Sequence, residues 1–171
     1  WFGPVHGGAT KRSLKAFSSH LEPGMQVLNV GSGPYQFKEW PAALNVDMFA
    51  FNGVAVIADA VKLPFQDGSI DAVICVALLE HVEKPDAVIA EIKRVLKEQG
   101  RCLCYLPFMV PYHAAPGDFH RWTEAGARAA FEGFSDVVVS VGAGPTSALL
   151  WVWQEWAATM FSFGNRPLHD I

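Results

Sequence analysis

The segment from residue 26 to 34, with the sequence QVLNVGSGP, constrains the fold of this chain more than any other. Apolar, strand-favouring residues run directly into Gly31 and Gly33, a pattern that predicts a buried strand followed by a tight turn. Glycine has no Cβ and adopts positive φ at little cost, so a ligand can approach the main chain closely at such a turn. In open α/β sheets, the turn after the first strand is a position where nucleotides bind.

The alternation of apolar segments predicts one α/β domain, 1–171, built on a mostly parallel sheet. We expect strands at 44–47, 54–59, 70–76, 101–106 and 136–141, and helices at 9–22, 85–99 (ended by Gly100) and 123–131. Elements in this order favour a doubly wound sheet whose strand order begins 3-2-1-4-5. The gaps between the first three strands are short for parallel crossovers, so loops or stunted helices are expected there.

Composition narrows the class of protein. Of the 171 residues, 51% are apolar and 18% are charged, as in a globular protein with a substantial core. The net charge of −4 argues against a nucleic-acid partner, because duplex-binding proteins usually carry a basic face. Cys75, Cys102 and Cys104 show no zinc-site spacing, so we expect three reduced thiols and no metal site. No signal peptide is recognisable, which favours a cytoplasmic protein.

Acids and glycines gather where the predicted strands end. Asp47 ends the second strand, Asp59 ends the third, and residues 77–81 follow the fourth. The carboxyl ends of parallel strands meet at one edge of a sheet, so these groups should converge on one crevice. An acid after the second strand is placed to accept hydrogen bonds from ribose hydroxyls, and an acid after the third from an adenine amino group. This edge therefore predicts a site for an adenosine-containing ligand.

Six segments carry a resemblance to a known family. They are VLNVGSG at 27–33, LNVD at 44–47, ADA at 58–60 with LPF at 63–65, DAVI at 71–74, LEHV at 79–82 and EIKRVLK at 91–97. In this order they resemble class I S-adenosylmethionine-dependent methyltransferases, of the small-molecule type that includes quinone-ring methyltransferases. The resemblance covers about residues 26–107, the expected cofactor-binding core, and implies a Rossmann-like methyltransferase fold. A seventh strand, usual in that family, is not recognisable here.

The resemblance also implies a cofactor, S-adenosylmethionine, and the residues that hold it. Gly31 and Gly33 would cradle its methionine part, Asp47 would bind the ribose, and Asp59 with the backbone of Ala60 would read the adenine. The implied set is Asn29, Gly31, Ser32, Gly33, Asp47, Met48, Asp59, Ala60, Ala77 and Leu78.

Two positions depart from the family pattern. Asn29 stands where the family often has an acid, and Tyr35 stands where it often has a third glycine. We expect both departures to affect cofactor affinity and to leave the fold unchanged.

The segment 108–122, expected to be the substrate loop, is rich in Pro, His and aromatic residues. A loop this long in a compact domain is usually functional, and its PYH, PGD and RWT motifs resemble a loop in a subset of these methyltransferases. A general base is needed only when the acceptor must lose a proton, and histidine suits that task near neutral pH. His113 is the first catalytic candidate, and His81 and His120 are the others.

Several charged residues near these motifs have a simpler, structural interpretation. Asp71 begins the fourth strand, at the wrong end of the sheet for catalysis, and Glu80 would cap the turn after that strand. Asp118 and Arg121 would pair with each other and hold the loop closed.

The segment 147–163 is strongly apolar, contains three tryptophans and predicts a helix. At about seventeen residues, with Glu155 inside, it is too short and too polar for a good transmembrane span. Three packing surfaces are open to it. We favour the sheet, then a partner subunit in a homodimer, and then a membrane surface.

These features favour methyl transfer from S-adenosylmethionine to an O, N or C nucleophile of a small-molecule acceptor, which the sequence does not identify. One alternative is a NAD-dependent oxidoreductase, but the third glycine of its G-x-G-x-x-G fingerprint is missing. The other alternative is a non-catalytic cofactor-binding or scaffold protein with the same fold. Cofactor binding without turnover of any acceptor would favour that second alternative.

Overall fold

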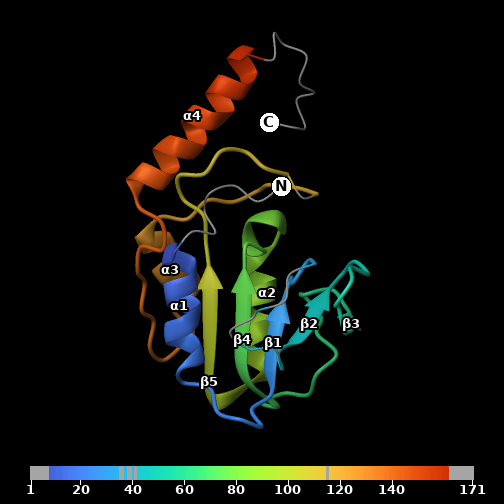
Figure 1. The fold of residues 1–171 in the computed structure, drawn as a ribbon. Helices are drawn as coiled ribbons and strands as arrows, with labels where there is room; N and C mark the ends of the chain where they lie inside the picture. The colour runs from blue at the N-terminus through green and yellow to red at the C-terminus, as the bar shows by residue number, and fades with distance from the viewer. Residues whose placement is uncertain (1–7, 35–36, 38–39, 41, 115, 162–171) are drawn as a thin grey trace.

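A computed structural model describes residues 8–34, 37, 40, 42–114 and 116–161. These residues form a five-stranded, fully parallel sheet in the order β3-β2-β1-β4-β5 (Figure 1). The strands are β1 (Val27–Val30), β2 (Leu44–Asp47), β3 (Val56–Ile57), β4 (Ile70–Val76) and β5 (Leu96–Tyr105). The predicted α/β class and strand order are confirmed.

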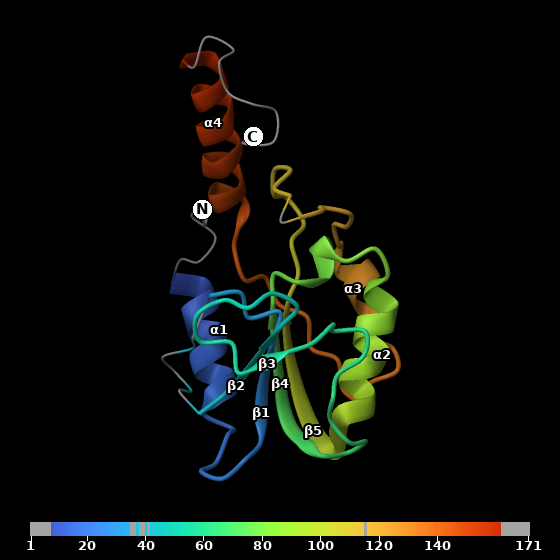
Figure 2. The same ribbon diagram turned by 90° about the vertical axis from the view of Figure 1, so that its right-hand side faces the viewer.

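Helices cover both faces of this sheet. One face carries α1 (Gly8–Ser18), and the other carries α2 (Pro85–Val95) and α3 (Glu124–Ala130) (Figure 2). A 3₁₀ helix, η2 (Leu79–His81), follows β4, and α4 (Pro145–Phe161) is the last described element. Among the described residues, no helix combines the length and apolar character that crossing a membrane requires.

The interior strand β4 organises the hydrophobic core. It pairs with β1 on one side and with β5 on the other, and its side chains alternate between two apolar clusters. Val73 belongs to the cluster that contains Ile92 of α2, whereas Ile74 belongs to the cluster that contains Leu14 of α1. A strand covered on both faces needs apolar residues at nearly every position, which explains the continuous apolar sequence of this segment.

Helix α2 ends earlier than its sequence pattern predicts. Gly100 is not its stop, because α2 ends at Val95 and Leu96 already has extended backbone as the first residue of β5. Ile70 pairs with Leu96 and Ala72 pairs with Arg101, so residues 97–100 bulge out of the ladder. Gly100 permits that bulge, since a Cβ there would lie 2.9 Å from the backbone oxygen of Lys97.

Two predicted strands differ from the structure. Residues 136–141 alternate like a strand but form none, and Val138 and Val141 are each 83% exposed. In the described part of the chain β5 is an edge strand of the sheet, but residues 136–141 form no ladder with it, so alternation alone does not make a strand. β3 is limited to Val56–Ile57, and no helix joins it to β2 through residues 48–55.

Helix α4 does not pack on the sheet, so the first expectation for this segment is wrong. It extends past the carboxyl ends of the strands (Figure 1), and Trp151 is buried while Trp153 and Trp156 are exposed. Contact with a partner subunit or a membrane surface stays a prediction. Residues 162–163 of the expected helix and Tyr35 lie outside the described residues.

Arg94 ties α2 to the segment that precedes β4. Its guanidinium donates to the backbone oxygens of Leu63 (3.1 Å) and Phe65 (2.9 Å) and to the carboxylates of Glu91 and Asp67. Glu91 also accepts a hydrogen bond from the Leu63 N–H at 2.7 Å. These bonds, above all the one from Arg94, hold the pKa of Glu91 below its ordinary value.

We expect Glu91→Gln to lower the free energy of unfolding at pH 7 by about 1 to 2 kcal/mol, because the glutamine supplies no charge to Arg94. Since folding lowers the pKa of Glu91, its stabilisation is complete above the ordinary value of 4.5 and is lost as the pH falls through the folded value. Urea unfolding from pH 7 to pH 3 should therefore show the two proteins converging below pH 4.5. A pH-independent difference would contradict this role, and Glu98→Gln, at an exposed position, is the control.

Candidate active site

The glycine turn after β1 is fastened to the end of β2. The backbone N–H groups of Gly31 and Ser32 both donate to the Val46 oxygen, at 2.9 and 3.1 Å. The Gly33 N–H donates to Asp47 Oδ2 at 2.7 Å, and the Phe49 N–H donates to Asp47 Oδ1 at 2.9 Å. A carboxylate offers about four lone-pair sites, so Asp47 can still accept from other donors at this edge. The predicted convergence of the turn and Asp47 is present.

The two glycines of the turn have different surroundings. Both have positive φ, +68° at Gly31 and +52° at Gly33. A Cβ on Gly31 would lie 2.7 Å from Cδ1 and 2.8 Å from Cβ of Leu78, whereas a Cβ on Gly33 would meet nothing within 4 Å. Leu78 therefore fills the space beside Gly31, and the space beside Gly33 is open.

The other residues implied as cofactor ligands divide into buried and exposed positions. Asn29 is buried between strands, where its Nδ2 donates to Asn45 Oδ1 at 2.9 Å. Asp59 is exposed, and its Oδ1 accepts a hydrogen bond from the Val61 N–H at 3.0 Å. Asp59 therefore caps the turn that follows it. Met48 is exposed next to Asp47.

The turn that leaves β4 brings further residues of that set to the same edge. Ala77 has a positive φ of 52°, unusual for a residue with a Cβ, and it directs the chain from β4 into η2. Leu78 follows against the glycine turn, and Ala60 is half-buried after β3. Ser32 is buried, and its hydroxyl donates to the Gly33 oxygen at 3.1 Å.

The loop after β5 returns onto η2. The Phe119 N–H donates to the backbone oxygen of Glu80 at 2.7 Å, and His81 Nδ1 lies 2.6 Å from the Gly117 oxygen. These contacts join segments that are separated by more than thirty positions in the sequence. They place the loop residue His113 beside η2, where its ring meets that of His81 edge-on with centroids 5.2 Å apart.

An ion pair inside the loop maintains its shape. The Asp118 side chain is 1% exposed, pairs with the guanidinium of Arg121 and accepts from the His113 N–H at 2.8 Å. Arg121 also donates to the Val110 and Pro111 oxygens. Burial alone would raise the pKa of Asp118, but its hydrogen bonds from Arg121 and His113 outweigh that effect and lower the pKa. The predicted pairing of Asp118 with Arg121 is confirmed.

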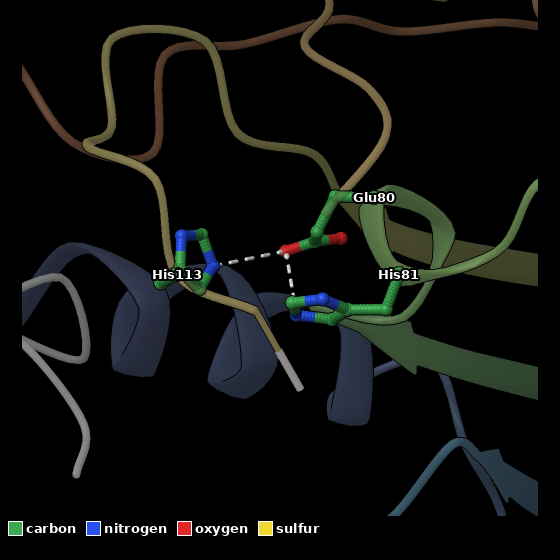
Figure 3. Close-up of side chains that lie close together, drawn as sticks. All are labelled: Glu80, His81 and His113. Atoms are coloured by element: carbon green, nitrogen blue, oxygen red, sulfur yellow. Dashed lines mark ion pairs between the residues drawn. The ribbon is translucent and has the colours of Figure 1, made fainter. Parts of the chain in front are cut away.

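Glu80, His81 and His113 form one group, which we call the Glu–His cluster. Nε2 of His81 and Nε2 of His113 each lie 3.9 Å from Oε1 of Glu80. Figure 3 shows both rings turned toward the carboxylate, one from the chain of η2 and the other from the loop. Glu80 is only 1% exposed, and no described residue donates a hydrogen bond to its Oε2.

Burial controls the protonation of this cluster. Removal from water raises the pKa of Glu80 to about 7, because the charged form loses its hydration. The same effect lowers the pKa of His81, which disfavours the imidazolium. Near neutral pH, the cluster can therefore exchange a proton without a large cost in free energy.

The three predicted catalytic histidines do not all come together. His81 and His113 belong to the Glu–His cluster, but His120 does not: its Nε2 lies 3.3 Å from the Glu83 oxygen and its ring lies beside Trp122. The ring of Trp151, from α4, lies 5.5 Å from that of His113. The sequence predicted only a capping role for Glu80 and no contact between the 147–163 helix and this site, and only the apolar residues around Glu80 indicated its burial.

Comparisons with known proteins agree with this fold. Residues 12–104, more than half of the chain, match the family described as a methyltransferase domain. The ubiquinone/menaquinone biosynthesis C-methyltransferase UbiE of Paraburkholderia phymatum is 29% identical over 121 residues, which cover 56% of this chain and 50% of that protein. UbiE of Desulfotalea psychrophila is 48% identical over 48 residues, which cover 28% and 20%. The chain thus spans half or less of the length of these relatives.

Solved structures show the same architecture at low sequence identity. An S-adenosylmethionine-dependent methyltransferase from Mesorhizobium loti has a TM-score of 0.60 and 17% identity, covering 91% of this chain and 94% of that one. One from Aquifex aeolicus has a TM-score of 0.59 and 19% identity, covering 81% and 86%.

The parallel sheet, with its glycine turn beside Asp47, defines a Rossmann-like methyltransferase fold. The chain belongs to the class I S-adenosylmethionine-dependent methyltransferases. The resemblance predicted from residues 26–107 is confirmed, and the class implies S-adenosylmethionine as methyl donor.

We expect Gly31→Ala to destabilise the protein more than Gly33→Ala. Both substitutions place a Cβ on a residue with positive φ, which costs about 1 to 2 kcal/mol. Only Gly31→Ala also drives that Cβ into Leu78, which should add about 1 to 3 kcal/mol. Urea unfolding measures both losses, and in a Leu78→Gly background, which lacks the clashing Cβ and Cδ atoms, the two glycine substitutions should cost the same. Equal losses at the two glycines would contradict the contact with Leu78.

Proposed function

We propose that this protein transfers a methyl group from S-adenosylmethionine to an apolar small-molecule acceptor at the carboxyl edge of its sheet. The observation that carries the proposal is the pairing of two features at that edge. The glycine turn with Asp47 follows β1 and β2, and the Glu–His cluster follows β4 and β5. A cofactor at the first and an acceptor at the second would meet within one crevice.

The chain has groups that fit the cofactor. The open space beside Gly33 would admit part of the ligand against the main chain, and the spare lone pairs of Asp47 suit ribose hydroxyls. Asp59 is exposed and can accept from an adenine amino group while it accepts from the Val61 N–H. The bound cofactor supplies an electrophilic methyl group on a sulfonium.

The acceptor side offers apolar surface. Four large apolar side chains of the loop are exposed: Phe108, Met109, Tyr112 and Phe119. Exposed apolar groups around a few buried polar ones are typical of a small-molecule site. Relatives named as ubiquinone/menaquinone biosynthesis C-methyltransferases and as a sterol 4-C-methyltransferase of Caenorhabditis elegans agree with an apolar acceptor.

Methyl transfer depends on the alignment of the acceptor with the methyl group and, for acceptors that carry a proton, on a base. A bond forms between the acceptor atom and the methyl carbon while the carbon–sulfur bond breaks, and the bonding electron pair stays on sulfur. Holding the two reactants in line can contribute about 7 to 11 kcal/mol. When the acceptor atom carries a proton, we assign its removal to the Glu–His cluster, with His113 Nε2 as the first candidate. His120 is the least favoured histidine, because it lies outside the cluster.

We expect calorimetric titration to show micromolar binding of S-adenosylmethionine and S-adenosylhomocysteine and none of NAD. Asp59→Ala should weaken binding about tenfold, the equivalent of one hydrogen bond to a charged group. Asp59 is exposed, so this variant should stay folded, and Asp47→Asn should weaken binding as well. Glu98→Ala removes an exposed carboxylate at the opposite end of the sheet and should change nothing.

Two results would contradict the proposal. Absence of cofactor binding by the folded protein would remove its basis. Cofactor binding without methyl transfer to any apolar acceptor, followed with labelled methyl groups, would favour the non-catalytic cofactor-binding alternative.

A further inference from the structure

The protonation of the two clustered histidines follows from their backbone contacts. His81 Nδ1 lies 2.6 Å from the Gly117 oxygen, and His113 Nδ1 lies 2.9 Å from the Pro111 oxygen. A carbonyl oxygen can only accept, so each Nδ1 carries the hydrogen. A neutral imidazole has a single N–H, so each Nε2 presents a lone pair.

Three lone-pair-bearing atoms therefore face one another in the Glu–His cluster. They are Nε2 of His81 and Nε2 of His113, each 3.9 Å from the third, Oε1 of Glu80, and one ligand atom from each of the three residues lies within 4.8 Å of the others. Glu80 is buried, and among the described residues its Oε2 has no hydrogen-bond partner. Acceptors that converge in this way repel one another unless a proton or a metal ion lies among them.

We propose that the Glu–His cluster binds a divalent transition-metal ion, Zn²⁺ in the first place, through His81 Nε2, His113 Nε2 and Glu80. Two imidazoles and one carboxylate are a ligand set of catalytic zinc sites, which leave a coordination position open. The sequence did not predict this site, because the ligands come from two segments about thirty residues apart and have no motif spacing.

Two of the three separations between the ligand atoms need only a small adjustment to suit a metal. Ligand atoms about 2.1 Å from a tetrahedral ion are about 3.4 Å apart. Each Nε2 is 3.9 Å from Glu80 Oε1, so each contact must shorten by about half an ångström. His113 is the ligand that can move most easily, because it lies in a loop and its side chain is 30% exposed.

The surroundings of the ligands also match a metal site. Metal-binding histidines almost always donate their other ring N–H to a carbonyl or a carboxylate, which fixes the tautomer and orients the ring. Gly117 and Pro111 supply such carbonyls, and Asp118 Oδ2 lies 3.7 Å from His113 Nδ1. Zn²⁺ with one carboxylate and two neutral imidazoles has a net charge of +1, and the nearby Asp118 carboxylate is already paired with Arg121.

Metal binding itself does not depend on the proposed methyl transfer, but one consequence does. A metal with an open position would bind an acceptor oxygen and lower its pKa, so that the proton leaves to solvent and the histidines act as ligands. The site would then favour acceptors with an ionisable oxygen, such as enols and phenols.

Cobalt(II) titration of the chelator-treated full chain tests the site without cofactor or acceptor. We expect visible absorption bands of a site with nitrogen and oxygen ligands, displaced by Zn²⁺. His113→Ala and Glu80→Gln should each weaken binding at least about tenfold, since even loss of an outer-shell partner typically costs 10-fold or more. His120→Ala, a histidine of the same loop outside the cluster, should bind normally.

Cys102 and Cys104 are an alternative metal-binding site, and the cobalt titration distinguishes them from the Glu–His cluster. Cys102 Sγ and Cys104 Sγ are 3.4 Å apart, and thiolate ligation would add intense sulfur-to-cobalt absorption that disappears in a Cys102→Ser/Cys104→Ser variant. As a second readout, Zn²⁺ should raise the Tm of the wild type and of His120→Ala but not of His113→Ala. Absence of metal binding by the wild type, or unchanged binding in the folded His113→Ala protein, would overturn the proposal.

Discussion

The pairing of β4 with both β1 and β5 is the constraint on which the two halves of the site depend. Val30 pairs with Cys75, and Cys75 pairs with Cys104, so the ends of three strands are level. The glycine turn, η2 and the loop after β5 consequently start from one edge. A slip of one residue would turn every side chain of the shifted strand to the other face of the sheet and would displace the cofactor turn relative to the acceptor side.

A second constraint acts within the loop. The buried carboxylate of Asp118 is held by Arg121 and by the His113 N–H, and Arg121 also donates to three backbone carbonyl oxygens. This network fixes the backbone around His113 without any regular secondary structure. It also explains how a loop rich in Pro, His and aromatic residues can present a histidine to Glu80, since side-chain hydrogen bonds replace the missing ladder.

Much of the fold could be predicted because its signals are local. The apolar period of α2, the continuous apolar strand β4 and the acids at strand ends depend on neighbours in the sequence. The misjudged features depend on distant contacts instead. Glu80 is buried because Phe119 and Gly117 return onto η2, and residues 136–141 form no strand because the chain does not bring them into a ladder with β5. The end of α2 was missed because pairing with Ile70 draws Leu96 into the sheet.

Because Trp151 of α4 contacts His113, the position of α4 affects the free energy of binding at the Glu–His cluster. Trp151 is the buried residue of a helix whose other large apolar residues are mostly exposed, and its ring packs on a member of the Glu–His cluster. Any molecule that covers α4 and shifts it must also change the packing of His113. By thermodynamic reciprocity, a ligand or proton taken up at the cluster changes the affinity of α4 for that molecule by the same factor. Helix α4 thus contacts the Glu–His cluster through Trp151 and presents most of its other large apolar residues at the surface.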